Sequence, residues 1–315
     1  MRSYAIGMDI GGTTVKLGLF DQDAHLLDRW EIPTHTQDNG NYILPEAVDS
    51  IRDRLAQHGL DSNQLAGIGV GVPGPVDETG IVNKCVNLGW DVFNVKAELE
   101  RLLPGIPRVA VGNDANVATL GELWQGGGRG YASAVMLTLG TGVGGGVVIG
   151  SKILPGANGA AGEVGHMTVE PEENAPCTCG KRGCLEQYAS ANGIVFLAKR
   201  MLTQSQLPSP LRDISSFSAK DICDLARDED ELSKLILDRC GRYLGLAMSY
   251  IACTLDPQVF LIGGGMSKAG AVLLQPIERH YRKFAFHPSA HTPIVLAELG
   301  NDAGIYGCAA MVFDQ

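Results

Sequence analysis

Apolar side chains alternate with small or polar residues in two runs near the start of the chain. They occupy positions 6, 8 and 10, and then positions 15, 17 and 19, with Gly11-Gly12-Thr13-Thr14 between the two runs. Alternation with a period of two is typical of β-strands, and glycines between two such runs favour a tight turn. We therefore expect the chain to open with a β-hairpin over residues 4–20.

The rest of the first half predicts alternating helices and strands. Apolar residues at helical spacing over 44–55, followed by Gly59, predict a helix that ends at this glycine. The apolar runs 67–72 and 108–111 predict two buried strands, and residues 115–124 predict a helix directly after the second. Strands that alternate with helices indicate an α/β protein.

The second half repeats this pattern, with a strand at 134–139, a glycine-rich turn at 140–146 and a return strand at 147–149. Because this pair resembles the opening hairpin, we expect an internal duplication with one copy in each of two lobes. Further along we expect helices at 187–201, 232–255 and 300–313, a strand at 259–262 and a connecting loop at 203–218.

The chain has 315 residues, of which 45% are hydrophobic and 19% are charged, as in a soluble globular protein with one large or two ordinary domains. Its formal charge of −10 and the lack of any Lys/Arg run argue against a nucleic-acid partner. Asp9 interrupts the first apolar stretch, so we expect no signal peptide and a cytoplasmic location. Residues 131–151 are uncharged, but their alternation predicts a strand and a turn rather than a membrane span.

Three cysteines and a histidine lie close together in the sequence. Cys177, Cys179 and Cys184 have the spacing Cys-x-Cys-x4-Cys, and glycines between them favour a turn that brings the thiols together. With His166 they form a Cys3His set, which predicts a closed, structural Zn²⁺ site. The alternative is that these are incidental thiols, which is our interpretation of the five other cysteines.

Both glycine-rich turns also contain threonine, and such turns bind phosphate through consecutive backbone N–H groups and hydroxyls. Asp9 precedes the first turn, where it is placed to hold a hydrated Mg²⁺ on the phosphates of a nucleotide, and Lys16 follows it. For either turn alone, a tight hairpin without a ligand is the alternative. No Gly-x4-Gly-Lys-Ser/Thr motif is present, and the dinucleotide-like pattern that starts at Gly140 is followed by residues unsuited to a helix.

Asn113 and Asp114 follow a predicted strand and precede a predicted helix, where polar groups gather in α/β proteins. Asp114 is a candidate general base for an attacking hydroxyl, and Asn113 is a candidate group to orient that hydroxyl. The alternative is that the pair caps the helix, a position that both residue types favour.

Glu163, His166 and Glu186 flank the predicted metal site, so a metal-bound loop would hold them in a small volume. Ligands with many hydroxyls, such as sugars, need several such donors and acceptors. A metal-bound imidazole uses its second nitrogen in a hydrogen bond, so His166 is a candidate for binding both metal and sugar.

These motifs together resemble the ROK sugar kinases, which belong to the actin-like and hexokinase-like ATPases. The resemblance covers the full length and rests on the following segments: Asp9-Ile-Gly-Gly-Thr-Thr14, Asn113-Asp114-Ala-Asn116, Leu139-Gly-Thr-Gly-Val-Gly-Gly-Gly146, Glu163-Val-Gly-His166 and Cys177-Thr-Cys-Gly-Lys-Arg-Gly-Cys184-Leu-Glu186. It implies a two-lobed fold of duplicated ribonuclease-H-like domains, with residues 1–116 and the C-terminal helix 302–315 in a small lobe and residues 117–301 in a large lobe.

The resemblance also implies roles for individual residues. Asp114 is expected to be the catalytic base, and Glu163, His166 and Glu186 to contact the sugar. The expected ATP ligands are Gly11, Gly12, Thr13, Thr14, Thr141 and Gly142 on the phosphates, and Gly263, Gly264 and Gly265 beside the adenosine. Gly74 and Asn87 are expected to complete the sugar pocket.

Within the family, residues 162–168 and 186–190 are most similar to bacterial glucokinases, so we expect phosphorylation of glucose to glucose 6-phosphate and a homodimer. An N-acetylmannosamine or N-acetylglucosamine kinase is the alternative. ROK proteins also include sugar-sensing regulators, but those carry a helix-turn-helix before the first lobe, and here the first hairpin starts at Tyr4. A non-catalytic sugar binder would be expected to have lost Asp114 or the glycine turns.

Overall fold

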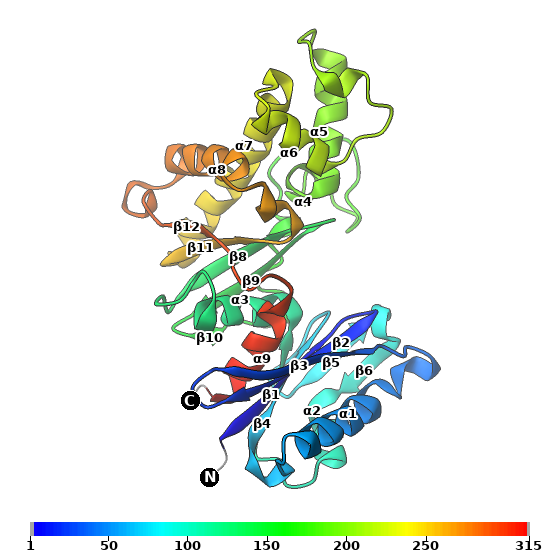
Figure 1. Ribbon diagram of the computed structural model, residues 1–315. Coiled ribbons are helices and arrows are strands. Elements are labelled where there is room, and N and C mark those ends of the chain that lie inside the picture. Colours follow the sequence, from blue (N-terminus) through cyan, green and yellow to red (C-terminus); the bar gives the residue numbers. More distant parts are fainter. Residues whose placement is uncertain (1–2, 314–315) are drawn as a thin grey trace. The chain divides into compact units, whose positions relative to one another are not determined.

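The computed structural model describes residues 3–313, and the chain in it forms two compact units (Figure 1). The first comprises Met1–Ala132, Gly146–Gly162 and Leu299–Gln315, and the second comprises Ser133–Gly145 and Glu163–Glu298. The expected α/β class is confirmed. The predicted division into lobes after residue 116 stays a prediction.

The first sheet contains the predicted opening hairpin. Its strands lie in the order β3-β2-β1-β4-β7, and their bounds are β1 Tyr4–Ile10, β2 Thr14–Asp21, β3 Leu26–Pro33, β4 Leu65–Val72 and β7 Val109–Asn113. Strands β1, β2 and β3 are antiparallel neighbours, and β1, β4 and β7 run parallel. Ile10 pairs with Val15 across the glycine turn, which confirms the predicted hairpin.

Successive residues of β1 face opposite sides of this sheet. Ile6, Met8 and Ile10 belong to a core with helix α1 (Ile43–Gln57), whose apolar face was predicted from its spacing. On the other side, Gly7 lies against α9 (Ala303–Phe313), and a Cβ on this glycine would be 2.1 Å from the Ile305 carbonyl oxygen. Figure 1 shows α1 and α9 on the two sides of the sheet. The helix that closes the chain therefore packs directly on the backbone of β1.

The second sheet repeats this arrangement. Its order is β10-β9-β8-β11-β12, with bounds β8 Ala134–Leu139, β9 Val143–Ile149, β10 Lys152–Ile153, β11 Val259–Gly263 and β12 Ile294–Leu296. As in the first sheet, an antiparallel pair stands at one edge and the last three strands run parallel. The matching orders support the predicted internal duplication.

The predicted start of the return strand at residue 147 was wrong, because β9 begins at Val143 and includes three glycines. A Cβ on Gly146 would lie 2.1 Å from the Thr119 hydroxyl, so this glycine lets the strand approach a helix closely. Glycine inside a strand often marks such a close approach.

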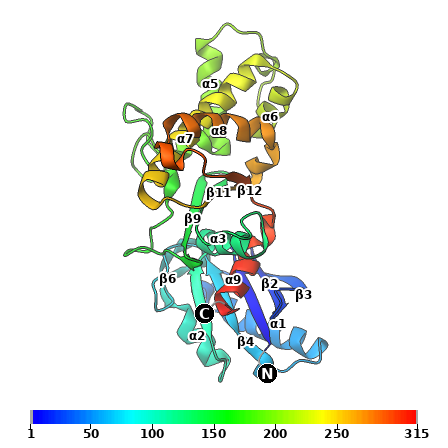
Figure 2. The same cartoon turned by 90° about the vertical axis from the view of Figure 1, so that its left-hand side faces the viewer.

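The helices of the second unit lie together on one side of this sheet in both views (Figure 1, Figure 2). They are α4 Glu186–Ala189, α5 Ala191–Gln204, α6 Ala219–Arg227, α7 Glu231–Leu255 and α8 Ala271–Phe284. The single helix predicted over 187–201 was wrong, because the chain breaks at Ser190. This residue has extended backbone, and its hydroxyl accepts the Gly193 N–H at 2.9 Å as the N-cap of α5.

The remaining elements complete the first unit: β5 Ile81–Cys85, β6 Trp90–Asn94, α2 Val95–Leu102 and α3 Asp114–Gln125. Within residues 3–313, no helix combines the length and the hydrophobicity that a membrane crossing needs. Of the five cysteines outside the predicted metal site, four are buried, as expected of incidental core thiols, and Cys253 is exposed.

Candidate active site

In the first unit, three residues predicted to form the site lie at one edge of the sheet. Asp9 is near the carboxyl end of β1, Gly74 follows the end of β4, and Asp114 follows the end of β7. These three strands are parallel neighbours, so their carboxyl ends meet at the same edge. Ligands of open α/β sheets bind at this edge.

The helix-capping role proposed for the Asn113-Asp114 pair belongs to Asn113. Its side-chain oxygen accepts the N–H groups of Ala115 and Asn116 at 3.1 and 3.2 Å, and its amide nitrogen donates to the Gly74 carbonyl at 3.2 Å. Asp114 is the first residue of α3, and its Oδ1 accepts the Ala115 N–H at 2.8 Å. The cap thus places Asp114 at the positive end of the helix dipole, which favours a negative charge.

Asp9 lies in a confined position beside α9. Gly304 leaves it room, since a Cβ there would be 2.5 Å from the Asp9 Oδ2. Burial raises the pKa of the Asp9 carboxyl to about 6, Lys16 opposite it on β2 lowers this pKa, and Asp114 raises it. A cation beside Asp9 would offset the cost of burying its charge.

Because the pKa of Asp9 is raised, we expect the free energy of unfolding to depend on pH. Between the ordinary value of 3.8 and about 6 the folded chain holds this proton more firmly than the unfolded chain, so stability falls as the pH rises through this window. Between pH 4 and pH 7 we expect Asp9→Asn to gain about 3 kcal/mol in unfolding free energy relative to wild type. Chemical denaturation at several pH values measures this, with Asp91→Asn on the exposed side of β6 as the control. A difference that does not vary with pH would contradict it.

The first glycine turn is closed and tied to its surroundings. The Gly11 N–H donates to the Thr14 carbonyl at 3.0 Å, and Thr34 holds the turn by donating its N–H to the Thr13 carbonyl and its hydroxyl to the Gly11 carbonyl. A Cβ on Gly12 would be 3.7 Å from the Asn87 Cβ. Gly12 of the predicted phosphate turn therefore lies next to Asn87 of the predicted sugar pocket.

In the second unit, two glycine turns follow the parallel strands β8 and β11. Gly264 has a φ of 81°, and a Cβ there would be 2.5 Å from the Leu139 carbonyl oxygen, which precedes Gly140. Beside the turns lies a cavity of about 520 Å³. Of the predicted nucleotide-binding residues, Thr141 and Gly265 line it, together with residues of α6.

The α6 wall of this cavity was missed at the sequence level. Arg227 pairs with Asp224 on the same helix and donates to the carbonyls of Lys268 and Ala269, which follow the second turn. It therefore links α6 to the chain after β11. The available signal was the amphipathic pattern after Ser218, whose hydroxyl caps this helix.

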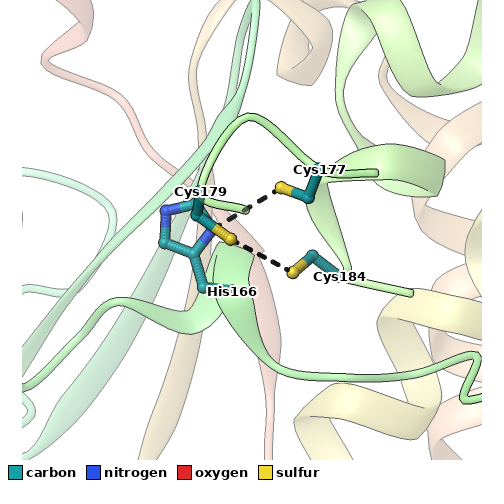
Figure 3. A group of neighbouring side chains, drawn as sticks. All are labelled: His166, Cys177, Cys179 and Cys184. Atoms are coloured by element: carbon teal, nitrogen blue, oxygen red, sulfur yellow. Dashed lines mark hydrogen bonds between the residues drawn. The ribbon is translucent and has the colours of Figure 1, made fainter. Parts of the chain in front are cut away.

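The four predicted metal ligands come together in the second unit (Figure 3). Their ligand atoms all lie within 4.8 Å of one another, with 3.6 Å between the Cys179 and Cys184 sulfurs and 4.0 Å between the Cys177 sulfur and the His166 Nδ1. Two sulfurs at about 2.3 Å from a tetrahedral zinc are about 3.8 Å apart. The cluster therefore fits a zinc site in ligand types, number and spacing.

The surroundings of the cluster shift the pKa values of its thiols in opposite directions. Burial and the neighbouring thiols of Cys179 and Cys177 raise the pKa of Cys184 to about 12, whereas the Lys181 backbone N–H lowers the pKa of Cys179. Gly183 allows the loop to close, because a Cβ there would be 1.8 Å from the Glu170 carbonyl oxygen. The expectation that glycines form the turn between the cysteines is confirmed.

Glu163 and His166 lie next to each other beside this cluster. The His166 Nδ1 faces Cys177, and its Nε2 is 4.0 Å from the Glu163 Oε2. The Glu163 side chain is 59% exposed, so it is accessible to a ligand. One imidazole nitrogen therefore faces the Cys177 sulfur while the other faces a carboxylate, and the predicted sugar role of His166 stays a prediction.

A buried network that was not predicted supports the same loop. Glu173 accepts hydrogen bonds from the Ala175 N–H, the Tyr188 hydroxyl and Arg200. Burial opposes the charge, yet these hydrogen bonds outweigh it and lower the pKa of Glu173 to about 2. Glu173 comes before the cysteine segment Cys177–Cys184, here called the metal loop, and Tyr188 follows it. The network therefore fixes both ends of the metal loop.

A glycine turn and a carboxylate at a helix start in the first unit, and a glycine turn and a Cys3His cluster in the second, are the groups expected of a phosphotransferase. Comparison with known proteins places the chain in this class. The ROK family profile matches residues 5–315, and the chain belongs to the ROK family.

Individual relatives agree with this assignment. The chain is 43% identical to a glucokinase of Halalkalibacterium halodurans, covering 99% of this chain and 96% of that protein. It resembles the crystal structure of a ROK family glucokinase from Streptomyces griseus in complex with glucose and AMPPNP, with a TM-score of 0.71, 33% identity and 98% of each chain covered. A ROK hexokinase from Thermus thermophilus has a TM-score of 0.78 and 28% identity, covering 98% of this chain and 97% of that one.

Proposed function

We propose that the protein is a hexose kinase that transfers the γ-phosphoryl group of ATP to the 6-hydroxyl of glucose. The observation that carries this proposal is the full-length similarity to a protein named glucokinase, at 43% identity. The contents of each unit support it: the first unit contains Asp9 and Asp114 beside a glycine turn, and the second contains Thr141 beside a cavity and the Cys3His cluster.

Asp114 acts as the general base. It takes the proton of the 6-hydroxyl as that oxygen forms its bond to the γ-phosphorus, while the bond from phosphorus to the β–γ bridging oxygen breaks and ADP leaves. Its position at the start of α3 leaves a carboxylate facing the edge where Gly74 and Asn87 are expected to bind the sugar. Glu163, His166 and Glu186 contact the remaining hydroxyls.

The phosphates of ATP bind to the backbone and hydroxyl groups of the first glycine turn and to Thr141 and Gly142 of the second. Lys16 contributes a positive charge beside Asp9. Asp9 would hold a hydrated Mg²⁺, and this ion would neutralise charge on the phosphates of ATP. The adenosine occupies the cavity between the glycine turns and α6, which Gly265 lines, and Gly263 and Gly264 directly precede Gly265 in the chain.

The Cys3His cluster holds a structural Zn²⁺, and its role is to fix the loop that carries the sugar ligands. We also propose that the protein is a homodimer in the cytoplasm. Size-exclusion chromatography with light scattering tests the dimer.

The test of the function is ADP release by the purified protein with MgATP and one sugar at a time. Glucose, mannose, fructose, N-acetylglucosamine and N-acetylmannosamine form the panel, with a control without sugar. We expect glucose to give the highest kcat/KM by at least about tenfold, because a site built to pair each hydroxyl discriminates against altered ones. Preference for an N-acetylated sugar would contradict glucose as the substrate and support the alternative of an N-acetylhexosamine kinase. No activity with any sugar would overturn the kinase proposal.

A further inference from the structure

Glu186 connects two parts of the second unit that are far apart in the sequence. Its Oε2 accepts the N–H of Val143, the first residue of β9 directly after the second glycine turn, at 3.2 Å. Its Oε1 accepts from the metal loop, where the Thr178 hydroxyl donates at 3.2 Å and the Cys177 sulfur lies at 3.6 Å. The carboxylate thus lies between the phosphate-type turn and the metal loop.

The glycine turn is shaped around this carboxylate. A Cβ on Gly142 would be 2.2 Å from the Glu186 Oε2, so only a glycine leaves the carboxylate in this place. Thr141, Gly142, Cys177, Thr178 and Glu186 line the same cavity, which has a volume of about 450 Å³. The position of the Glu186 carboxylate is therefore set from one side by backbone and from the other side by the metal loop.

On the metal-loop side, Thr178 is the stronger of the two donors. A hydroxyl at 3.2 Å forms an ordinary hydrogen bond, whereas a thiol is a weak donor. Thr178 lies between two metal-binding cysteines, yet its own side chain is not a metal ligand type. A carboxylate oxygen has two lone pairs, so Oε1 can accept from Thr178 and from a ligand hydroxyl together.

We propose that Thr178 is a positioning residue that holds the Glu186 carboxylate in the orientation in which it receives a sugar hydroxyl. This inference rests on the proposed function, since it takes Glu186 to be a sugar ligand. The Cys3His region then acts on the sugar through the Thr178 hydroxyl as well as through His166. Without the Thr178 hydroxyl, the Val143 N–H still holds Oε2, but Oε1 keeps only the weak thiol contact, so the orientation of the carboxylate is less restricted and a bound sugar must order it.

The test compares Thr178→Val, which has nearly the same size but no donor, with Thr178→Ser, which keeps the donor. In Thr178→Val we expect the KM for glucose to rise about fivefold to tenfold, the effect of one hydrogen bond, with kcat and the KM for ATP within about twofold. In Thr178→Ser we expect the KM for glucose to return to within about twofold of wild type. Thr203→Val, which removes a hydroxyl at the end of α5, is the matched control.

A merely structural role would give a different result. Loss of metal from the variant, measured by plasma mass spectrometry, or a rise in the KM for glucose that serine does not rescue, would overturn the proposal. An unchanged KM for glucose in Thr178→Val would overturn it as well.

The Glu186→Gln variant tests separately whether Glu186 is a sugar ligand, the assumption on which the role of Thr178 rests. If Glu186→Gln raises the KM for glucose and Thr178→Val does not, Glu186 is a sugar ligand that does not depend on Thr178. If neither variant changes it, Glu186 does not contact the sugar, and the assignment of sugar ligands fails with the inference.

Discussion

In the Asp114→Asn variant, we expect kcat to fall by about a thousandfold while glucose still binds with an affinity within about threefold of wild type. General base catalysis contributes factors of about 10² to 10⁴ in rate, and an amide cannot take the proton of the 6-hydroxyl. Asparagine keeps an oxygen that can accept the Ala115 N–H, which Asp114 Oδ1 accepts at 2.8 Å, so the start of α3 should be preserved. The loss is therefore one of chemistry and not of folding.

Steady-state ADP release and calorimetric titration with glucose measure the two effects separately. Asp91→Asn makes the same change of carboxylate to amide on the exposed side of β6 in the same unit and should leave both unchanged. Turnover close to wild type in Asp114→Asn would show that another group accepts the proton. A parallel loss of glucose affinity would show that Asp114 mainly binds the ground-state sugar.

The sequence predicted those parts of the fold that depend on local signals. The opening hairpin follows from alternation around Gly11 and Gly12, and α1 follows from apolar residues at helical spacing. The metal cluster follows from three closely spaced cysteines and one histidine, because metal ligation requires those side-chain types. In each case neighbouring residues carry the information that determines the structure.

Other features depend on contacts between distant residues and could not be predicted in this way. The break at Ser190 separates α4 from α5 within a continuous helical pattern, because Ser190 caps the second helix while the Ala191 N–H donates to the Gly140 carbonyl. Likewise, β9 starts early because its glycines allow a close approach to Thr119. Propensity gives no indication of such packing.

The candidate site follows the same division. The motifs predicted residues for metal, phosphate and sugar binding, and the structure brings the four predicted metal ligands together as expected. The contacts that orient them were not found. In the sequence, Thr178 is only the residue between two cysteines, and the structure shows that its hydroxyl donates to Glu186. Positioning groups of this kind have no sequence signature, because any small donor at the right place serves.

Removal of the metal is expected to weaken glucose binding strongly, the largest effect we expect after that of Asp114→Asn. In Cys184→Ser we expect the protein to lose most of its zinc and the KM for glucose to rise by about tenfold to a hundredfold, because His166 and the cysteine loop beside Glu186 are then no longer held together by the metal. Cys184 is one of the four predicted ligands, so its replacement leaves three of them. Its side chain is fully buried in the cluster.

Nucleotide binding should be affected much less, because the cavity beside α6 is lined by residues outside the metal loop. The measurements are zinc content by plasma mass spectrometry, the KM for glucose, and titration with a non-hydrolysable ATP analogue. Cys253→Ser, an exposed cysteine on α7, is the matched control and should keep both zinc and activity. A zinc-free Cys184→Ser protein with the glucose KM of wild type would show that the metal stabilises the loop without positioning the sugar ligands.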